Sequence, residues 1–142
     1  MELCDIPREV IPSDQWATPD LMFQDWHARF DFTLDAAATA ENKKLERYCI
    51  DGLSDSWAGE RVWINPPYSN PLPWCRRAYE ETASGNCPLV VMLLRVDTST
   101  AWFHDWLLGK AEIEWLRRRI RFVGATGSPN FASMLAIYRS PK

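Results

Sequence analysis

An uninterrupted apolar run, PLVVMLLR at 88–95, constrains the fold more than any other part of the chain. A strand with one face in solvent alternates apolar and polar residues, whereas an unbroken apolar run predicts a strand buried on both faces. Helix-compatible segments flank the run at 72–84 and 99–108, and Gly85 and Gly109 are well placed to end them. We therefore predict an α/β fold in which helices cover a sheet.

The remaining predicted elements extend this pattern. A helix at 20–29 follows Pro19, a favoured residue at helix starts. Alternation of strands and helices in the central part indicates parallel strands with right-handed crossovers, and short loops near the end indicate at least one antiparallel pair. The result is one domain over residues 16–142, a mixed sheet flanked by helices, preceded by an irregular arm at 1–15. The predicted strands lie at 30–35, 61–65, 112–116, 119–123 and 133–138, with a further helix-compatible segment at 36–45.

Composition excludes several classes of protein. No segment reaches the ~18 apolar residues of a membrane helix, and the acidic N-terminal stretch lacks the apolar centre of a secretory signal. The four cysteines are scattered and form no C-x-x-C pair. We therefore predict no metal site, no membrane partner and a reduced, cytoplasmic protein.

Charge is distributed unevenly along the chain. Residues 1–71 carry 6 Lys and Arg against 13 Asp and Glu, a net of −7, whereas residues 72–142 carry 10 against 6, a net of +4. The densest basic cluster consists of Arg117, Arg118, Arg119 and Arg121. A local basic surface attracts polyanions whatever the total charge, so this cluster indicates either a nucleic-acid contact or a solvated strand or turn.

The stretch VWINPPYSN at 62–70 ends a predicted strand in two prolines and an aromatic ring. The Asn65 carboxamide oxygen and the proline carbonyls are acceptors, and proline has no N–H, so the corner is rigid and rich in acceptors. An exocyclic amino group offers two donors to such a corner, and Tyr68 can stack on the ring that carries it. Asp35 also follows a predicted strand, and ligands bind beyond the carboxyl ends of strands in these sheets. The pattern indicates a pocket for a planar amine, with a plain turn as the alternative.

The N-P-P-Y motif resembles the signature of amino-methyltransferases that use S-adenosylmethionine, and the wider chain resembles the small phage-type DNA N-6-adenine methyltransferase (Dam-type) family. The resemblance implies a Rossmann-like class I methyltransferase fold, S-adenosylmethionine as cofactor and adenine N6 in DNA as the methyl acceptor. The stretches that carry it are WATP (16–19), FDFTLDAAATAEN (30–42), DGLSDSW (51–57), VWINPPYS (62–69), VVMLLRVDTSTAWF (90–103), AEIEWLRRRIRF (111–122) and ASMLAIYR (132–139).

The same resemblance implies roles for individual residues. Thr18 and Pro19 would lie against the methionine part of the cofactor, Asp35 would hold its amino group, and Asp51 and Leu53 would contact its adenine. The full predicted cofactor set is Trp16, Thr18, Pro19, Asp35, Ala36, Ala37, Asp51, Leu53 and Asn65. The predicted catalytic set, which holds the target base, is Asn65, Pro66, Pro67 and Tyr68. The predicted DNA contacts are Ser69, Asn70, Arg117, Arg118, Arg119 and Arg121.

The chain departs from larger methyltransferases in two places. Ala36, Ala37 and Ala38 stand where those enzymes have a glycine-rich loop. Only 29 residues separate Asp35 from Asn65, too few for two intervening strand–helix units, so we predict a trimmed sheet that lacks one or two edge strands. The ribose would then fall to Glu41 or Asn42. Arg95 stands where the family often has proline.

Structural alternatives exist for most of these residues. Asp35 could cap a helix, Thr18-Pro19 could start one, and Asp51-Gly52 could form a turn. Core packing is the preferred interpretation for Trp57, Trp63 and Trp74, and a surface or structural role for His27 and His104.

The predicted activity also has alternatives. N-P-P-Y geometry suits cytosine N4, an RNA adenine or a protein glutamine as well as adenine in DNA, and a catalytically silent binding module is a further possibility. A base in duplex DNA would have to flip out to be methylated. Because no separate recognition module is evident, we predict short or relaxed sequence specificity, or recognition completed by a second subunit such as a homodimer partner.

Overall fold

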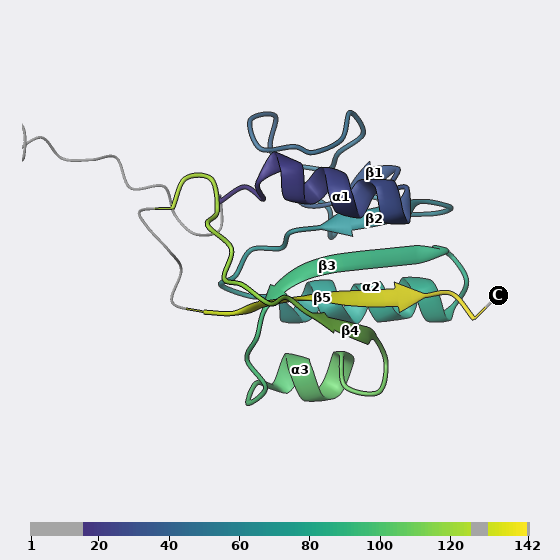
Figure 1. Cartoon of the computed structure of the whole chain (residues 1–142). Helices are drawn as coiled ribbons and strands as arrows, with labels where there is room; N and C mark the ends of the chain where they lie inside the picture. The colour runs from purple at the N-terminus through teal and green to yellow at the C-terminus, as the bar shows by residue number, and fades with distance from the viewer. Residues whose placement is uncertain (1–15, 126–130, 142) are drawn as a thin grey trace, which may run out of the picture.

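The computed structural model of the chain describes residues 16–125 and 131–141 (Figure 1). The predicted arm at 1–15 lies outside the described residues. The described part contains a five-stranded sheet and three helices, which confirms the predicted mixed α/β, Rossmann-like fold. The elements are α1 (Asp20–Phe30), β1 (Leu34–Asp35), β2 (Arg61–Ile64), α2 (Leu72–Ala83), β3 (Leu89–Arg95), α3 (Ala101–Trp106), β4 (Glu112–Trp115) and β5 (Ser133–Arg139).

The strands lie in the order β1-β2-β3-β5-β4. β1, β2 and β3 are parallel, whereas β5 is antiparallel to both β3 and β4. The predicted apolar run forms β3, whose first six residues are buried, and it occupies the middle of the sheet. Both predicted features, a parallel part and a terminal antiparallel part, are therefore confirmed.

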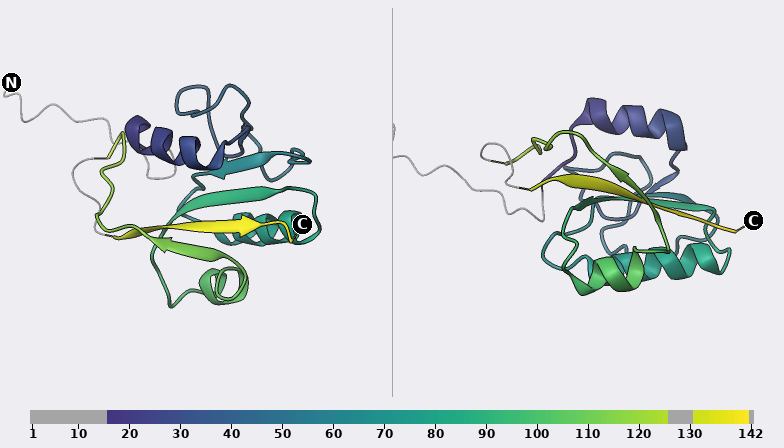
Figure 2. Two further views of the ribbon diagram at one scale, coloured as in Figure 1. Left: turned by 45° about the vertical axis from the view of Figure 1, so that its right-hand side comes forward. Right: turned by 60° about the horizontal axis from the view of Figure 1, so that its bottom comes forward.

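Helices cover the two faces of the sheet, as the right-hand view of Figure 2 shows, with α1 on one side and α2 and α3 on the other. Two buried apolar clusters fill the layers. The α1 side is strongly aromatic, with Phe23, Trp26 and Phe32 packed around Trp63. The opposite side holds Trp57 and Trp74 among aliphatic residues. All three tryptophans with a core interpretation are therefore buried.

The first strand is shorter than predicted because α1 extends one residue further. Phe30 ends the helix, and Asp31 adopts the left-handed conformation (φ 54°) that terminates it. Only Leu34 and Asp35 then pair with β2. The expected alternation at 30–35 reflects buried aromatic side chains around a helix end rather than a full strand.

The predicted helix at 36–45 is wrong: the segment forms turns. The Asp35 carboxylate accepts hydrogen bonds from the backbone N–H groups of Ala37 (3.4 Å) and Lys44 (2.9 Å), and the Asn42 side chain accepts one from Thr39 N–H (2.6 Å). Such side-chain acceptors compete with helical hydrogen bonds. Asp35 consequently does not cap a helix, and β1 is connected to β2 by a loop.

The predicted strand at 119–123 is also wrong, although buried and exposed residues alternate there. Ile120 and Phe122 are buried and their neighbours are exposed, which explains the alternating pattern. The segment joins no strand of the sheet, and Val123 forms an isolated bridge with Ala17 instead. Periodicity detected the alternation of burial but not the missing strand partner.

Candidate active site

Polar side chains meet at one edge of the sheet, where the parallel strands end. Asp35 is the last residue of β1, Asn65 follows the last residue of β2, and Arg95 is the last residue of β3. Because parallel strands end at the same edge, these residues lie on the rim where α/β sheets bind ligands. The rim predicted from the sequence is therefore present.

A cleft opens at this rim and has a polar and an apolar part, which share Ala37, Asn42 and Asn65. The apolar part is a cavity of about 140 Å³. The polar part is also lined by Trp16, Ala17, Thr18, Asp35, Lys44 and Trp63. The apolar part is also lined by Ala38, Thr39, Ile50, Pro67 and Trp74. A site with an acidic polar part and an adjoining apolar part matches a ligand with a cationic group and an apolar group.

Asp35 supplies the negative charge of the polar part. The side chain is only 2% exposed, and burial raises the pKa of this carboxyl to about 6, against the lowering effect of the hydrogen bonds from Lys44 and Ala37 N–H and of the Lys44 charge. A buried carboxylate of raised pKa is costly to ionise, so a cationic ligand beside it is stabilising.

Asn65 lines both parts of the cleft and has an acceptor without a partner among the described residues. Its Nδ2 donates a hydrogen bond of 3.2 Å to the Trp16 carbonyl, which fixes the orientation of the carboxamide. Its Oδ1 is buried and has no hydrogen-bond partner among the described residues, and the same is true of Thr18 Oγ1. Leaving a buried acceptor unpaired costs about 1–3 kcal/mol, which marks the site as one built to receive a donor.

Tyr68 is less accessible than its predicted stacking role suggests. The residue is 8% exposed, and its ring makes edge-on contacts with Phe122 (5.7 Å between centroids) and Phe131 (5.5 Å). Burial raises the pKa of its hydroxyl well above the usual range. A base could stack on Tyr68 only after one of these phenylalanines shifts. Of its neighbours, Pro66 is buried and Ser69 and Asn70 are exposed.

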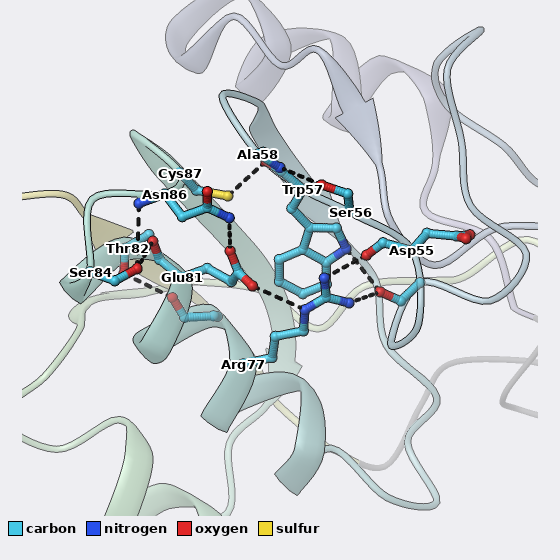
Figure 3. A network of polar contacts seen from close by, with 12 residues as sticks. Asp55, Ser56, Trp57, Ala58, Arg77, Glu81, Thr82, Ser84, Asn86 and Cys87 are labelled. Carbon is cyan, nitrogen blue, oxygen red and sulfur yellow. Dashed lines mark hydrogen bonds and ion pairs between the residues drawn. The ribbon is translucent and has the colours of Figure 1, made fainter.

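The loop at 51–57 is fixed to α2 by Arg77, as Figure 3 shows. The guanidinium lies 4.1 Å from the centre of the Trp57 ring and donates to the carbonyls of Gly52 and Asp55. Trp57 Nε1 also donates to the Gly52 carbonyl (2.9 Å). Gly52 lies so close to the end of β1 that an added Cβ would be 1.6 Å from the Ala36 carbonyl oxygen. The loop is thereby held against the rim.

Asp51 and Leu53 are not among the residues that line the cleft. Asp51 is exposed, and its carbonyl accepts from Ser54 and Asp55 N–H, so the predicted turn is present. Leu53 is 39% exposed and borders a separate surface hollow beside α2. Ile50, directly before this loop, is 78% exposed and lines the apolar part of the cleft.

The predicted basic cluster passes close to the rim. Arg117, Arg118, Arg119 and Arg121 are exposed. The segment they belong to continues to Phe122 and Val123. The Phe122 ring stacks on the Trp16 ring (5.9 Å between centroids), and Val123 pairs with Ala17 through two backbone hydrogen bonds. The cluster therefore continues directly into residues that contact the site.

The predicted site residues omit seven of the residues that line the cleft, namely Ala17, Ala38, Thr39, Lys44, Ile50, Trp63 and Trp74. Among them, Lys44 lines the cleft because the loop after β1 folds back towards Asp35. Ile50 lines the cleft because the loop that follows it packs against Ala36 through Gly52. Neither has a local sequence signal, since both positions depend on loop geometry. The two histidines have structural partners: His27 Nδ1 accepts from Phe32 N–H (3.1 Å), and His104 Nε2 contacts the Thr98 carbonyl.

Two features of other protein classes are absent from the described residues. No group of three or more His, Cys, Asp or Glu in this part of the chain is arranged to hold a metal ion. No helix in the same part is long and apolar enough to cross a membrane.

The fold and the rim define a protein of the Rossmann-like methyltransferase class. A family model described as DNA N-6-adenine-methyltransferase (Dam) matches residues 6–140, and the chain belongs to this family. It is 35% identical over 136 residues to a DNA N-6-adenine-methyltransferase of Haemophilus phage HP1, covering 88% of this chain and 78% of that protein. It is 37% identical over 108 residues to a DNA N-6-adenine-methyltransferase of Escherichia phage T1, covering 72% of this chain and 44% of that protein.

Proposed function

We propose that this chain transfers the methyl group of S-adenosylmethionine to the N6 amine of adenine in DNA. The observation that carries the proposal is the buried Asn65 Oδ1 directly after β2, which has no hydrogen-bond partner among the described residues and lies in the cleft that Asp35 also lines. The family and its two phage relatives support adenine in DNA as the acceptor.

The cleft fits the cofactor in charge and shape. Asp35 would hold the cationic amino group, and Thr18 Oγ1, buried without a partner among the described residues, would bind its methionine part. The apolar part, with Ile50 and Trp74, would take the flat adenine. Asn42 borders both parts and is our candidate for the ribose. The bound cofactor supplies an electrophilic methyl group.

The remaining residues of the predicted cofactor set would act through the backbone of the rim. Trp16 holds the Asn65 carboxamide, Ala37 lines both parts of the cleft, and Pro19 starts α1 beside them. Ala36 forms the floor on which Gly52 packs. Asp51 and Leu53 would not contact the cofactor adenine directly. Their loop would position Ile50, which would make the contact.

The N-P-P-Y corner would orient the acceptor amine. Asn65 Oδ1 and the Pro66 carbonyl would each accept one of the two amine hydrogens, which would orient the amine and leave its nitrogen lone pair free to accept the methyl group. Pro67 keeps the corner rigid, and Tyr68 would stack on the flipped base once Phe122 or Phe131 moves. No strong base is required if the proton leaves after transfer.

The surface around the rim would hold the DNA. Ser69 and Asn70 are exposed directly after the corner, and the exposed Arg117, Arg118 and Arg119 lie before the segment that contacts Tyr68. Target-base flipping would cost a few kcal/mol, which these contacts must offset. We expect a short or relaxed target sequence and activity in the host cytoplasm, where the DNA is.

Product analysis tests this function. Wild-type protein is incubated with unmethylated DNA and labelled S-adenosylmethionine, and the digested nucleosides are separated. The proposal predicts label in N6-methyldeoxyadenosine. Label in N4-methyldeoxycytidine, in RNA or in a protein glutamine would contradict the assigned acceptor, and absence of transfer despite cofactor binding would contradict the activity.

A further inference from the structure

Three buried polar atoms at one end of the sheet lack hydrogen-bond partners among the described residues, and none of them belongs to the cofactor cleft. They are Tyr68 Oη, Arg95 Nε and Ser133 Oγ. Arg95 and Ser133 face each other directly across the antiparallel pair of β3 and β5. Side chains so paired lie roughly 4.5–5.5 Å apart at Cβ.

Strand alternation puts all three groups on the α1 side of the sheet. In β3, Val91 and Leu93 belong to the α1-side core, so Arg95, two residues further along the strand, points the same way. In β5, Leu135 belongs to the same core, so Ser133, two residues before it, also points to that side. Tyr68 is itself a member of that core.

Tyr68 and Arg95 are close enough to interact electrostatically. Burial dominates and raises the pKa of the Tyr68 hydroxyl, while the Arg95 charge opposes that rise. The hydroxyl therefore stays protonated and able to donate. The acidic neighbour of Arg95 is Asp97, whose Oδ2 lies 3.8 Å from Arg95 Nη2 and whose Oδ1 accepts from Ser99 Oγ (2.9 Å). That ion pair is long, and it leaves Arg95 Nε without a partner among the described residues.

We propose that Tyr68, Arg95 and Ser133 form a phosphate-binding notch that holds the DNA backbone beside the flipped target nucleotide. One cationic group and two hydroxyl donors on the same side of the sheet suit a phosphodiester, and a guanidinium binds phosphate through paired N–H groups. The Arg95 side chain is 43% exposed, so its outer nitrogens can reach the DNA directly. The Tyr68 and Ser133 hydroxyls are buried and would join the phosphate once the side chains that cover them shift. The notch adjoins the N-P-P-Y corner through Tyr68, and none of its three residues lines the proposed cofactor cleft.

This inference rests on the proposed function, and its test uses that activity. Once the methylated site is known from the product, duplexes are prepared in which each phosphate flanking the target adenine is replaced by a neutral methylphosphonate. Wild type and Arg95→Ala are compared for methylation and DNA binding. Arg76→Ala is the control, because Arg76 is exposed on α2, pairs with Glu80 and lies on the opposite side of the sheet.

Arg95→Ala should raise the KM for natural DNA about tenfold and reduce the salt dependence of binding by about one phosphate contact, without altering cofactor affinity. One methylphosphonate should weaken wild-type binding by a similar factor and leave Arg95→Ala unaffected. Arg95→Lys should recover part of the loss, and Ser133→Ala should show a smaller loss at the same phosphate.

Three results would overturn the notch while leaving the methyltransferase assignment intact. The first is an unchanged KM for DNA in Arg95→Ala. The second is an Arg95→Ala variant whose binding is weakened further by the methylphosphonate, by the same factor as in the wild type. The third is an Arg95→Ala loss that disappears when adenine N7 is removed from the DNA rather than when a phosphate charge is removed. Absence of methyl transfer by the wild type would instead contradict the proposed function.

Discussion

Protonation of Asp35 should control cofactor affinity below neutral pH. Burial raises the pKa of its carboxyl from 3.8 to about 6. At about 1.4 kcal/mol per pKa unit, ionising this group in the folded protein costs on the order of 3 kcal/mol more than in water. A cofactor ammonium group beside the ionised carboxylate would recover part of this cost, whereas a protonated Asp35 would provide no such attraction.

The sign of the effect follows from the direction of the pKa change. Because the folded pKa is raised, this group favours the folded state most below pH 3.8, and its contribution falls as pH rises towards 6. Cofactor affinity changes in the opposite direction, since binding needs the ionised form. At pH 5, about one molecule in ten has Asp35 ionised, so the Kd for S-adenosylmethionine should be about tenfold higher than at pH 7.

Isothermal titration between pH 5 and 7 measures this dependence. Asp35→Asn should bind more weakly at pH 7 and show a nearly flat profile. Asp31→Asn is the matched control, because Asp31 is exposed, lies at the end of α1 and has a left-handed conformation that asparagine also adopts. A wild-type Kd that stays constant across this range, or an Asp35→Asn profile as steep as the wild type's, would show that Asp35 does not control binding.

Three further substitutions test how the rim is supported. Gly52→Ala would place a Cβ 1.6 Å from the Ala36 carbonyl oxygen, so chemical denaturation should show a loss of at least about 1–3 kcal/mol together with weaker cofactor binding; wild-type stability would contradict the close approach. Trp57→Ala removes a fully buried indole and should cost about 3–5 kcal/mol by the same measurement, and a loss below about 1 kcal/mol would show that the loop is not held by it. Tyr68→Phe removes a buried hydroxyl that has no partner among the described residues, so its thermal midpoint should equal or exceed that of the wild type; a clearly lower midpoint would indicate a partner for the hydroxyl.

The sheet was predictable because its central strand is unambiguous. The apolar run of β3 and the prolines after β2 mark where these strands end in the sequence. The position of the rim then follows, because parallel strands end at the same edge of the sheet. The helix predicted at 36–45 does not form because backbone N–H groups of this segment donate to the side chains of Asp35, Thr39 and Asn42 instead of to helical carbonyls. Helix propensity does not include these side-chain acceptors. The strand predicted at 119–123 failed because alternating burial does not reveal whether a neighbouring strand exists.

From the residues themselves, without the family resemblance, the candidate site was predictable at strand ends. Asp35 and Asn65 line the cleft because strand ends place them there. Ile50 and Lys44 enter it through loops whose paths depend on distant contacts, such as the Arg77 bonds to the Gly52 carbonyl and the Lys44 pair with Asp20 (2.6 Å). These contacts join positions that are more than twenty residues apart, so no local pattern contains them.

Methyl transfer by this protein should depend above all on Asn65 Oδ1 as an acceptor, and single-turnover methylation by Asn65→Ala isolates that role. The variant is compared with wild type at saturating cofactor and DNA, alongside Asn86→Ala, which changes the same side chain beyond the other end of the sheet. Losing one preorganised hydrogen-bond partner of the reacting amine should slow methyl transfer about 100- to 1,000-fold, with Asn86→Ala unchanged. A rate for Asn65→Ala within about threefold of the wild type would contradict the acceptor role.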